Sequence, residues 1–583
     1  MESEPDDFPR TVAKPAGVRE LSLRAVIVGM LVAAIMGSAY PYVVLKLGFG
    51  PNVSVVAAFF GFIFLGLASR TYNRWENNLV QTAGTAAAQT AFMCVLLAAF
   101  DMLVHQKALP PEAVPTRLQT FAWLTAAGLL GVLLAVPMRR HFVVDEKLAY
   151  PDGTAAAETL IVLDSRGQEG RRATEWLLLG ALASLALAAA NEDFHLLKLF
   201  PGTLLVGPPL IKAMNIGLNW SLLSVGSGML VGLRINVSML LGTLVAWVIA
   251  PYVLTGFGWI KEGTRTAVLF WVMWPATAML VAGGLAALIL RWKVLARTFT
   301  NLGGARVETD DFPLRWVGIG CIAATFALVI LQKAWFGLEP WITLVAILLS
   351  VPLMLVGLRV LGETNWGPIS ALSNLMQGVF GALAPGNIPA NMLASGTTGT
   401  IAVESEALMQ DYKAGHIIGS SPRLLTYMQL LATPIGALAV AFMYPLVRDT
   451  YGIVGETAQL SSPISRRWAG FAEILSKGFE ALPPYALHAL AIGAILGVVL
   501  TVLESRGLKK WVPSPTGMGI GMIVPGSVII MMFLGGVIET VWRKRSRMSC
   551  ELYMTPLASG LIAGEAILAV IVPLLALSGF LRV

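Results

Sequence analysis

The sequence predicts an all-α polytopic membrane protein built as two homologous halves, and three observations support this prediction. Of its 583 residues, 56% are hydrophobic and only 13% are charged, whereas ordinary soluble domains carry about 25% charged residues. Apolar segments recur along the whole chain, many of them close to the roughly 20 residues that a helix needs to cross a bilayer. Short motifs of the first half also reappear, in the same order, in the second half.

The apolar segments predict about 14 to 16 transmembrane helices, some of them broken or re-entrant. Clear spans are expected at residues 24–45, 53–68, 80–103, 118–137, 175–190, 236–254, 267–290, 316–331, 341–360, 424–447, 485–502, 519–541 and 556–577. Shorter apolar pieces, or pieces interrupted by Gly or Pro, lie near 153–163, 200–210, 221–233 and 369–383.

The charges of the loops predict the orientation. Arg70 and Arg74 follow the second span, and Arg139 and Arg140 lie between the fourth and fifth. Positively charged residues concentrate in cytoplasmic loops, so both loops and the N-terminus are expected inside the cell. Residues 1–20 open with the acidic MESEPDDFPR and are predicted to be a cytoplasmic tail, not a cleaved signal peptide. The net charge of +7 fits basic loops of a multi-pass protein of the cell inner membrane, and not a nucleic-acid partner.

One motif occurs three times. GTAAAQT at residues 84–90 is nearly repeated as GTAAAET at 153–159, and more loosely as GTIAVES at 399–405. Gln89 and Glu158 occupy the same position, so the motif exists in a neutral and an ionisable version. Its glycine and alanine, four residues apart, would also let two helices pack closely, which is the structural alternative to a functional role.

Matching positions keep a similar spacing between the two parts of the chain. The offsets are 316 for Ser54 and Ser370, 315 for Gly84 and Gly399, 315 for Glu158 and Glu473, 289 for Ser238 and Ser527, and 281 for 280–283 and 561–564. Gly/Ala-rich helices resemble one another by composition, but collinear pairs favour a duplication. We predict a first repeat half at 21–290, a connecting loop with one extra span at 291–340, and a second half at 341–577. Transporters built from repeats bind substrate near the middle of the membrane, where helices are broken.

The stretch from 399 to 423 carries several charges inside an apolar chain. A charged side chain in the middle of a membrane costs about 3 kcal/mol on insertion scales, so such residues face a bundle interior and mark functional sites. Glu404 and Asp411 are seven residues apart and share one face of a predicted helix. Gly419 is expected to end that helix in the left-handed conformation, before a second helix that Pro422 opens. A solvated cytoplasmic helix is the alternative.

These residues also carry a family resemblance. MQDYKAG at 409–415, followed by Gly419 and by SPR at 421–423, resembles the signature of the oligopeptide transporter family, in its bacterial branch close to the plant yellow-stripe-like carriers. ENNLVQTA at 76–83, LAYPDGTA at 148–155 and GMIVP at 521–525 are similar to further family motifs. The resemblance implies a carrier with many spans, driven by the proton gradient, that moves small peptides or metal–chelate complexes.

Two sets of candidate site residues follow. The proposed proton-coupling carboxylates are Glu404, Asp411, Glu158 and Glu473. The proposed substrate-binding residues are Lys413, Arg423, Tyr150, Gln89 and Asn78. Lys413 or Arg423 could pair alternately with Glu404, and the break at 150–153 would place Tyr150 beside a cavity. For Asn78 the alternative is a capping role at the start of a helix.

Other chemistry has little support in the sequence. The five histidines are isolated, the three cysteines are scattered, and neither HExxH nor a P-loop occurs, so we expect no metal site, cofactor or ATP hydrolysis. We therefore predict a proton-coupled secondary transporter that imports small oligopeptides or peptide-like metal chelates. A metal–siderophore carrier, a polytopic membrane enzyme and a passive channel are the alternatives. The expected partners are the substrate, protons and the lipid bilayer, and a homo-oligomer is left open.

Overall fold

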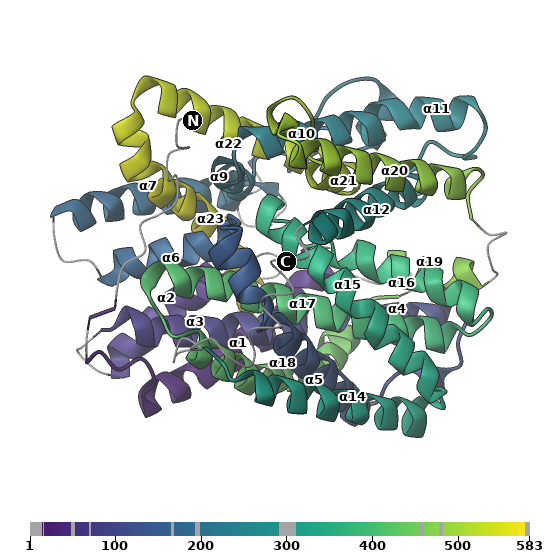
Figure 1. The fold of residues 1–583 in the computed structure, drawn as a ribbon, viewed down its shortest axis with the longest axis horizontal. Coiled ribbons are helices and arrows are strands. Elements are labelled where there is room, and N and C mark those ends of the chain that lie inside the picture. The colour runs from purple at the N-terminus through teal and green to yellow at the C-terminus, as the bar shows by residue number, and fades with distance from the viewer. Residues whose placement is uncertain are drawn as a thin grey trace.

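The computed structural model describes residues 14–577, except 16, 48–52, 69–71, 165–167, 193–196, 198, 291–310, 455–459, 461 and 477–481. Its regular structure is almost entirely helical (Figure 1). Ten helices within these ranges are long and apolar enough to cross a membrane, and four shorter helices are also apolar. The predicted all-α polytopic membrane fold is confirmed. Much of the predicted N-terminal tail and of the connecting loop lies outside the described residues.

The helices up to residue 290 are α1 (Leu23–Leu47), α2 (Ser54–Ala68), α3 (Arg74–Ala91), α4 (Cys94–His105), η1 (Pro111–Ala113), α5 (Arg117–Ala135), η2 (Arg140–Asp145), α6 (Pro151–Asp164), α7 (Gln168–Ala190), α8 (Pro209–Ala213), α9 (Leu222–Val231), α10 (Leu233–Thr243), η4 (Leu244–Ile249), α11 (Ala250–Gly256) and α12 (Arg265–Leu290). Two short strands, β1 (Thr203–Leu205) and β2 (Gly217–Asn219), pair antiparallel with Thr203 opposite Asn219.

The later helices are α14 (Leu314–Phe336), α15 (Pro340–Thr364), α16 (Ile369–Leu383), α17 (Ile388–Ile418), α18 (Pro422–Tyr451), α19 (Pro463–Ser476), α20 (Ala486–Ser505), η7 (Leu508–Lys510), α21 (Pro515–Ile523), α22 (Gly526–Arg545) and α23 (Arg547–Leu577). The span predicted at 316–331 corresponds to α14.

Helix boundaries follow local sequence at some places and differ from the prediction at others. Gly419 ends α17 with φ 77°, and Pro422 opens α18, as predicted. The span expected at 80–103 lies within one candidate membrane span, Arg74–His105, which a turn at Phe92 and Met93 divides into α3 and α4. The span expected at 519–541 is split before Pro525, which has no N–H to continue the helix.

The helices form two bundles, and each bundle combines one segment from before residue 291 with one from after residue 310 (Figure 1). The first contains α1–α5 and α14–α19, with α3 packed on α1 and α18, and α17 packed on α5, α15 and α16. The second, in the upper part of Figure 1, contains α7, α9–α12 and α20–α23, with α12 packed on α20 and α23 on α7. Helix α6 contacts both α17 and α23, so it lies where the two bundles meet.

Close contacts in the second bundle are reciprocal. A Cβ atom at Gly228 of α9 would lie 1.9 Å from the Met532 carbonyl oxygen, and one at Gly521 of α21 would lie 1.9 Å from that of Met239. Gly228 and Gly521 are 293 residues apart, and so are Met239 and Met532. A second pair of contacts has the same spacing. A Cβ atom at Gly535 would lie 2.1 Å from the Val225 carbonyl oxygen, and one at Gly242 would lie 2.1 Å from the Met518 carbonyl oxygen. This spacing differs by about one helical turn from the 289 residues expected from Ser238 and Ser527.

The first bundle has a corresponding pair of crossings. A Cβ atom at Gly131 of α5 would lie 2.5 Å from the Ile401 carbonyl oxygen of α17. One at Gly436 of α18 would lie 2.5 Å from the Ala87 carbonyl oxygen of α3. The two glycines are 305 residues apart, and the two residues that they meet are 314 apart. At both crossings two helix backbones touch, which only glycine allows.

Candidate functional site

Helix α17 carries the predicted site and is enclosed by protein. It begins after Asn387, whose side chain accepts a hydrogen bond from the Ala390 N–H, and runs to Ile418. Nearly every side chain along it is buried, including Glu404, Asp411 and Lys413. Burial excludes the alternative of a solvated charged helix. The charges therefore face the interior of the bundle, as expected for ionisable groups in a membrane protein.

Glu404 is fully buried at the contact between α17, α3, α5 and α18. Its Oε1 is hydrogen-bonded to the hydroxyl of Thr90 on α3. Its Oε2 accepts from Gln429 Nε2 at 3.0 Å and from Thr433 Oγ1 at 3.1 Å, both on α18. Gly128 of α5 leaves room for the side chain, because a Cβ atom there would lie 3.3 Å from Glu404 Cγ. All the partners of the carboxyl group are thus neutral.

The hydroxyls of Thr90 and Thr433 can form hydrogen bonds with Glu404 whether its carboxyl group is ionised or protonated. Each has one proton, and each also lies 2.9 Å from a helix carbonyl oxygen, that of Ala86 for Thr90 and that of Gln429 for Thr433. An ionised Glu404 would accept both hydroxyl protons. A protonated Glu404 would donate to Thr90, whose own proton would then go to Ala86. Gain or loss of a proton thus needs only a hydroxyl rotation and leaves both hydroxyls and the carboxyl group hydrogen-bonded.

Asp411 lies about two turns further along α17. Its Oδ1 accepts from Gln81 Nε2 at 2.6 Å, and Gln81 Oε1 accepts from Asn78 Nδ2 at 2.8 Å. This chain fixes the orientation of both amides. It leaves Asp411 Oδ2 and Asn78 Oδ1 buried and without a hydrogen-bond partner among the described residues. A buried acceptor without a donor is a place where a proton, a water or a polar ligand group can bind.

Helix α6 starts at the predicted backbone break. Tyr150 has φ 42°, and Pro151 is the first helical residue. The Tyr150 side chain is fully buried, and its hydroxyl donates to the Leu358 carbonyl oxygen at 2.8 Å. The Gly153 N–H donates to Gln410 Oε1 at 2.7 Å, and a Cβ atom at Gly153 would lie 2.3 Å from the Gln410 carbonyl oxygen. The break therefore holds the start of α6 against α15 and α17.

Asn365 links the two bundles at this break. It ends α15 with φ 62°, and its Nδ2 donates to Asp152 at 2.9 Å and to Ser227 of α9 at 3.2 Å. Its Oδ1 accepts from Gln410 Nε2 at 3.5 Å. Glu406 lies one turn before Gln410 and is buried, with Oε1 unpartnered in the described ranges. A polar cluster that includes a second open carboxylate thus lies near the junction of the bundles.

The remaining predicted residues lie apart from Glu404. Lys413 is buried near the end of α17, and Arg423 is half-buried in the first turn of α18, with Nη2 3.4 Å from the Tyr427 hydroxyl. Three others are half-buried on separate helices: Glu158 on α6, Glu473 on α19 and Gln89 on α3. Glu404 forms a hydrogen bond or ion pair with none of these five residues. The structure joins Asn78 to Asp411 through Gln81 and places Tyr150 at the bundle junction.

Comparison with known proteins decides the family. A family model described as "OPT oligopeptide transporter protein" matches residues 20–576. The chain belongs to the oligopeptide transporter family. It is 24% identical to the metal-nicotianamine transporter YSL2 of Arabidopsis thaliana, over 98% of this chain and 96% of the relative. It is also 24% identical to the iron-phytosiderophore transporter yellow stripe 1 of Zea mays, over 97% of this chain and 92% of the relative. The predicted family and the predicted class, a multi-pass membrane transporter, are confirmed.

Sequence reasoning missed four residues of this transporter that hold the central carboxylates, namely Gln81, Thr90, Gln429 and Thr433. Gln81 lies in the family-like motif at 76–83, and Thr90 is the last residue of the repeated motif at 84–90. Gln429 and Thr433 are four residues apart, so they share one face of an otherwise apolar span. That shared polar face was the available signal for α18.

Proposed function

We propose that this transporter is a proton-coupled secondary transporter in which Glu404 carries the proton. The observation that supports this most is the buried carboxyl of Glu404 among neutral groups that can hydrogen-bond to it in either protonation state. Ionisable groups enclosed within a membrane protein commonly form proton or substrate pathways. Asp411, whose Oδ2 is open, is the next group along the same helix and the second proposed proton site.

We also propose that residues 21–290 and 341–577 are homologous halves. The reciprocal glycine contacts at a constant spacing of 293 support this, because a two-fold relation between halves would produce contacts in such pairs. The order of helices supports it too. The counterparts would be α1 and α15, α2 and α16, α3–α4 and α17, α5 and α18, α6 and α19, α7 and α20, α9 and α21, α10–α11 and α22, and α12 and α23. Helix α14 would have no counterpart.

The packing direction favours halves of inverted topology. Counterparts α3 and α17 run antiparallel, since Gln81 contacts Asp411 while Thr90 contacts Glu404. Counterparts α10 and α22 do the same, with close contacts of Thr243 with Gly526 and of Leu233 with Gly536. An axis along the membrane normal would make counterparts parallel, so antiparallel counterparts support an axis in the membrane plane. The single span α14 would supply the reversal.

Glu404 would then lie on that axis. In the glycine contacts of the first bundle, Ala87 of α3 and Ile401 of α17 are 314 residues apart, and Gly131 of α5 and Gly436 of α18 are 305 residues apart. With the first spacing, the counterpart of Glu404 would be Thr90. With the second, the counterpart of Thr433 would be Gly128. Both pairs touch: Thr90 is hydrogen-bonded to Glu404, and a Cβ atom at Gly128 would lie 2.6 Å from Thr433 Cγ2. Two counterparts in contact lie on the axis that relates them. In transporters with inverted repeats this place is near the middle of the membrane.

The substrate we propose is a small oligopeptide or a peptide-like metal chelate. The family description and the names of the two relatives support these two chemistries. No cluster of three or more His, Cys, Asp or Glu side chains suited to a metal occurs in the part of the chain that the structure describes. A metal would therefore travel inside its chelator. The loop charges favour a cytoplasmic N-terminus, and the proposed direction, import across the inner membrane, is the one that an inward proton gradient would drive.

The test is uptake by the purified protein in proteoliposomes. Labelled di- and tripeptides and metal–nicotianamine complexes are supplied separately, with and without an inward proton gradient. We expect one substrate class to accumulate above its external concentration only when the gradient is present, and a protonophore to abolish that accumulation. Accumulation that follows a sodium gradient would reject proton coupling. Simple equilibration under every condition would favour the channel alternative.

A further inference from the structure

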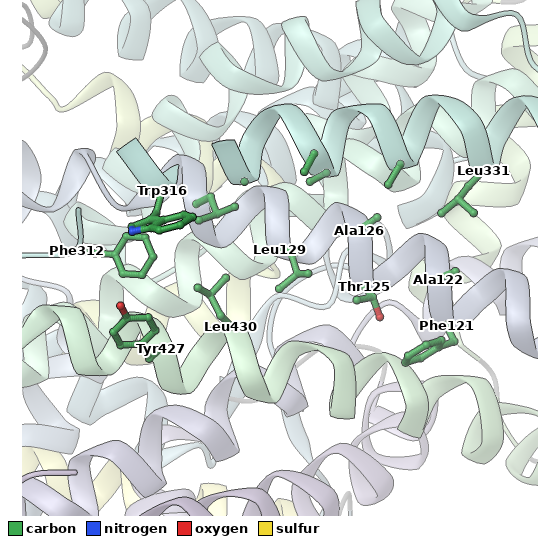
Figure 2. Close-up of a pocket in the computed structure, with 15 residues that line it drawn as sticks. Phe121, Ala122, Thr125, Ala126, Leu129, Phe312, Trp316, Leu331, Tyr427 and Leu430 are labelled. Carbon is green, nitrogen blue, oxygen red and sulfur yellow. The ribbon is translucent and has the colours of Figure 1, made fainter. Parts of the chain in front are cut away.

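A groove of about 750 Å³ lies between α5, α14 and α18, and its lining does not include Glu404 or the partners of its carboxyl group (Figure 2). We propose that this groove binds an anionic phospholipid, with acyl chains along α14 and the phosphate beside Arg423. The volume falls within the range of about 300–1,000 Å³ for small-molecule sites. The proposal does not depend on proton coupling or on the transported substrate.

The groove is apolar because of a regular pattern on α14. Small residues at 320, 323, 324 and 327 share one helix face and leave space that larger side chains would fill. Figure 2 shows Phe121 and Ala122 of α5 near Leu331 at one end, and Leu430 of α18 opposite Leu129. Apart from the Thr125 hydroxyl, the wall between the two ends is hydrocarbon, which suits an acyl chain and not a peptide or a chelate.

One face of α14 is not covered by any other part of the described structure. Ile319, Ile322 and Phe326 are 56%, 74% and 66% exposed. An apolar helix with such exposure in a membrane protein is covered by lipid, so the groove beside it opens to hydrocarbon. The molecules nearest to that opening are membrane lipids.

One end of the groove adjoins a second cavity that has charged side chains in its lining. There Phe312, Trp316 and Tyr427 gather, with the Phe312 and Tyr427 ring centroids 5.2 Å apart (Figure 2). Tyr427 also borders a second cavity, of about 430 Å³, whose lining includes Lys14, Glu20, Ser421 and Arg423. A single molecule that occupied both cavities would therefore need an apolar body and a polar head.

The cations at this end select an anionic head. Arg423 is half-buried and donates only to the Tyr427 hydroxyl, and it forms no ion pair within the described ranges. Arg315, in the first turn of α14, lies over the Trp316 ring at 5.7 Å and likewise has no carboxylate partner among the described residues. A guanidinium binds phosphate with two parallel hydrogen bonds, and Trp and Tyr favour the level of the lipid headgroups. In the proposed orientation this end is cytoplasmic, where anionic lipids attract basic residues.

The test is native mass spectrometry of the purified full-length protein with palmitoyl-oleoyl phosphatidylglycerol or phosphatidylcholine. We expect phosphatidylglycerol to bind about fivefold more tightly, the effect of one basic residue near an anionic lipid. Arg423→Gln should remove this preference. Its matched control is Arg117→Gln, since Arg117 lies over the Phe442 ring at the start of α5 and outside both cavities. Thermal unfolding with each lipid provides a second readout.

The groove itself is tested by filling it. Ala324→Phe should weaken binding of both lipids, whereas Ile322→Phe, on the exposed face of the same helix, should not. If Ala324→Phe folds poorly, Ala327→Leu fills the groove with a smaller change. The proposal is overturned if Arg423→Gln keeps the preference for phosphatidylglycerol, or if the groove variants bind lipid as Ile322→Phe does. It is also overturned if inorganic phosphate stabilises the lipid-free protein as much as phosphatidylglycerol does.

Discussion

Two helix crossings, one at Gly131 and one at Gly436, are too close to accommodate even one added methyl group. A Cβ atom at Gly131 would lie 2.5 Å from the Ile401 carbonyl oxygen and 2.9 Å from its Cα, and one at Gly436 would lie 2.5 Å from the Ala87 carbonyl oxygen. Ordinary contact begins at 3.4 Å. Alanine at either position would therefore push two helix backbones apart by about 0.9 Å, which a close-packed interior resists.

The loss of stability expected from overpacking can be compared with the stability that Gly→Ala usually adds in a helix. At an open position in a helix, Gly→Ala stabilises by about 1 kcal/mol. Overpacking costs about 1–3 kcal/mol, so Gly131→Ala and Gly436→Ala should each be destabilised by up to about 2 kcal/mol. The assay is thermal unfolding of the purified variants. Gly318→Ala on α14 is the control, because a Cβ atom there meets nothing within 4 Å. If both variants melt like this control, the tight crossings do not exist and the reasoning fails.

Three further predictions concern other contacts. Gly153→Leu should sharply lower the yield of monodisperse protein in size-exclusion chromatography, because even a Cβ atom there would lie 2.3 Å from a backbone oxygen of α17. Thr433→Val removes one donor to Glu404 and should cost about 1–3 kcal/mol, seen as a lower melting temperature and a slower gradient-driven uptake. Tyr444→Phe removes the hydroxyl bonded to Asp101 and should destabilise by a similar amount, whereas an unchanged melting temperature would show that this bond contributes nothing.

Features set by neighbouring residues could be predicted from the sequence. The turn between α17 and α18 needs only a left-handed Gly419 and Pro422 at the first helical position, and both features were predicted from the sequence. The break at Tyr150 and Pro151 was readable for the same reason. The break at Phe92 and Met93 was not, because neither residue interrupts a helix by itself. Helix α4 packs against α19, which lies more than 350 residues further along the chain, and such a contact cannot be predicted from neighbouring residues.

The partners of the carboxylates depend on distant segments. Glu404 and Asp411 were found because charge is rare in an apolar chain, but Thr90 lies 314 residues from the first and Gln81 lies 330 residues from the second. Lys413 was expected as a partner of Glu404 because it is near in sequence. The described conformation uses neutral donors instead. Desolvation of a second charge would be costly, whereas hydroxyl and amide donors stabilise a buried carboxyl group without that penalty.

The central claim is that Glu404 carries the coupling proton, and Glu404→Gln tests it most directly. Glutamine keeps the shape and the capacity for hydrogen bonds to Thr90 and Thr433, but it cannot release a proton. Glu551→Gln, an exposed change on α23, is the control. In proteoliposomes, Glu404→Gln should abolish accumulation driven by the pH gradient while exchange of substrate at equal concentrations continues, and Glu551→Gln should retain both. Accumulation by Glu404→Gln in response to the gradient would contradict the account.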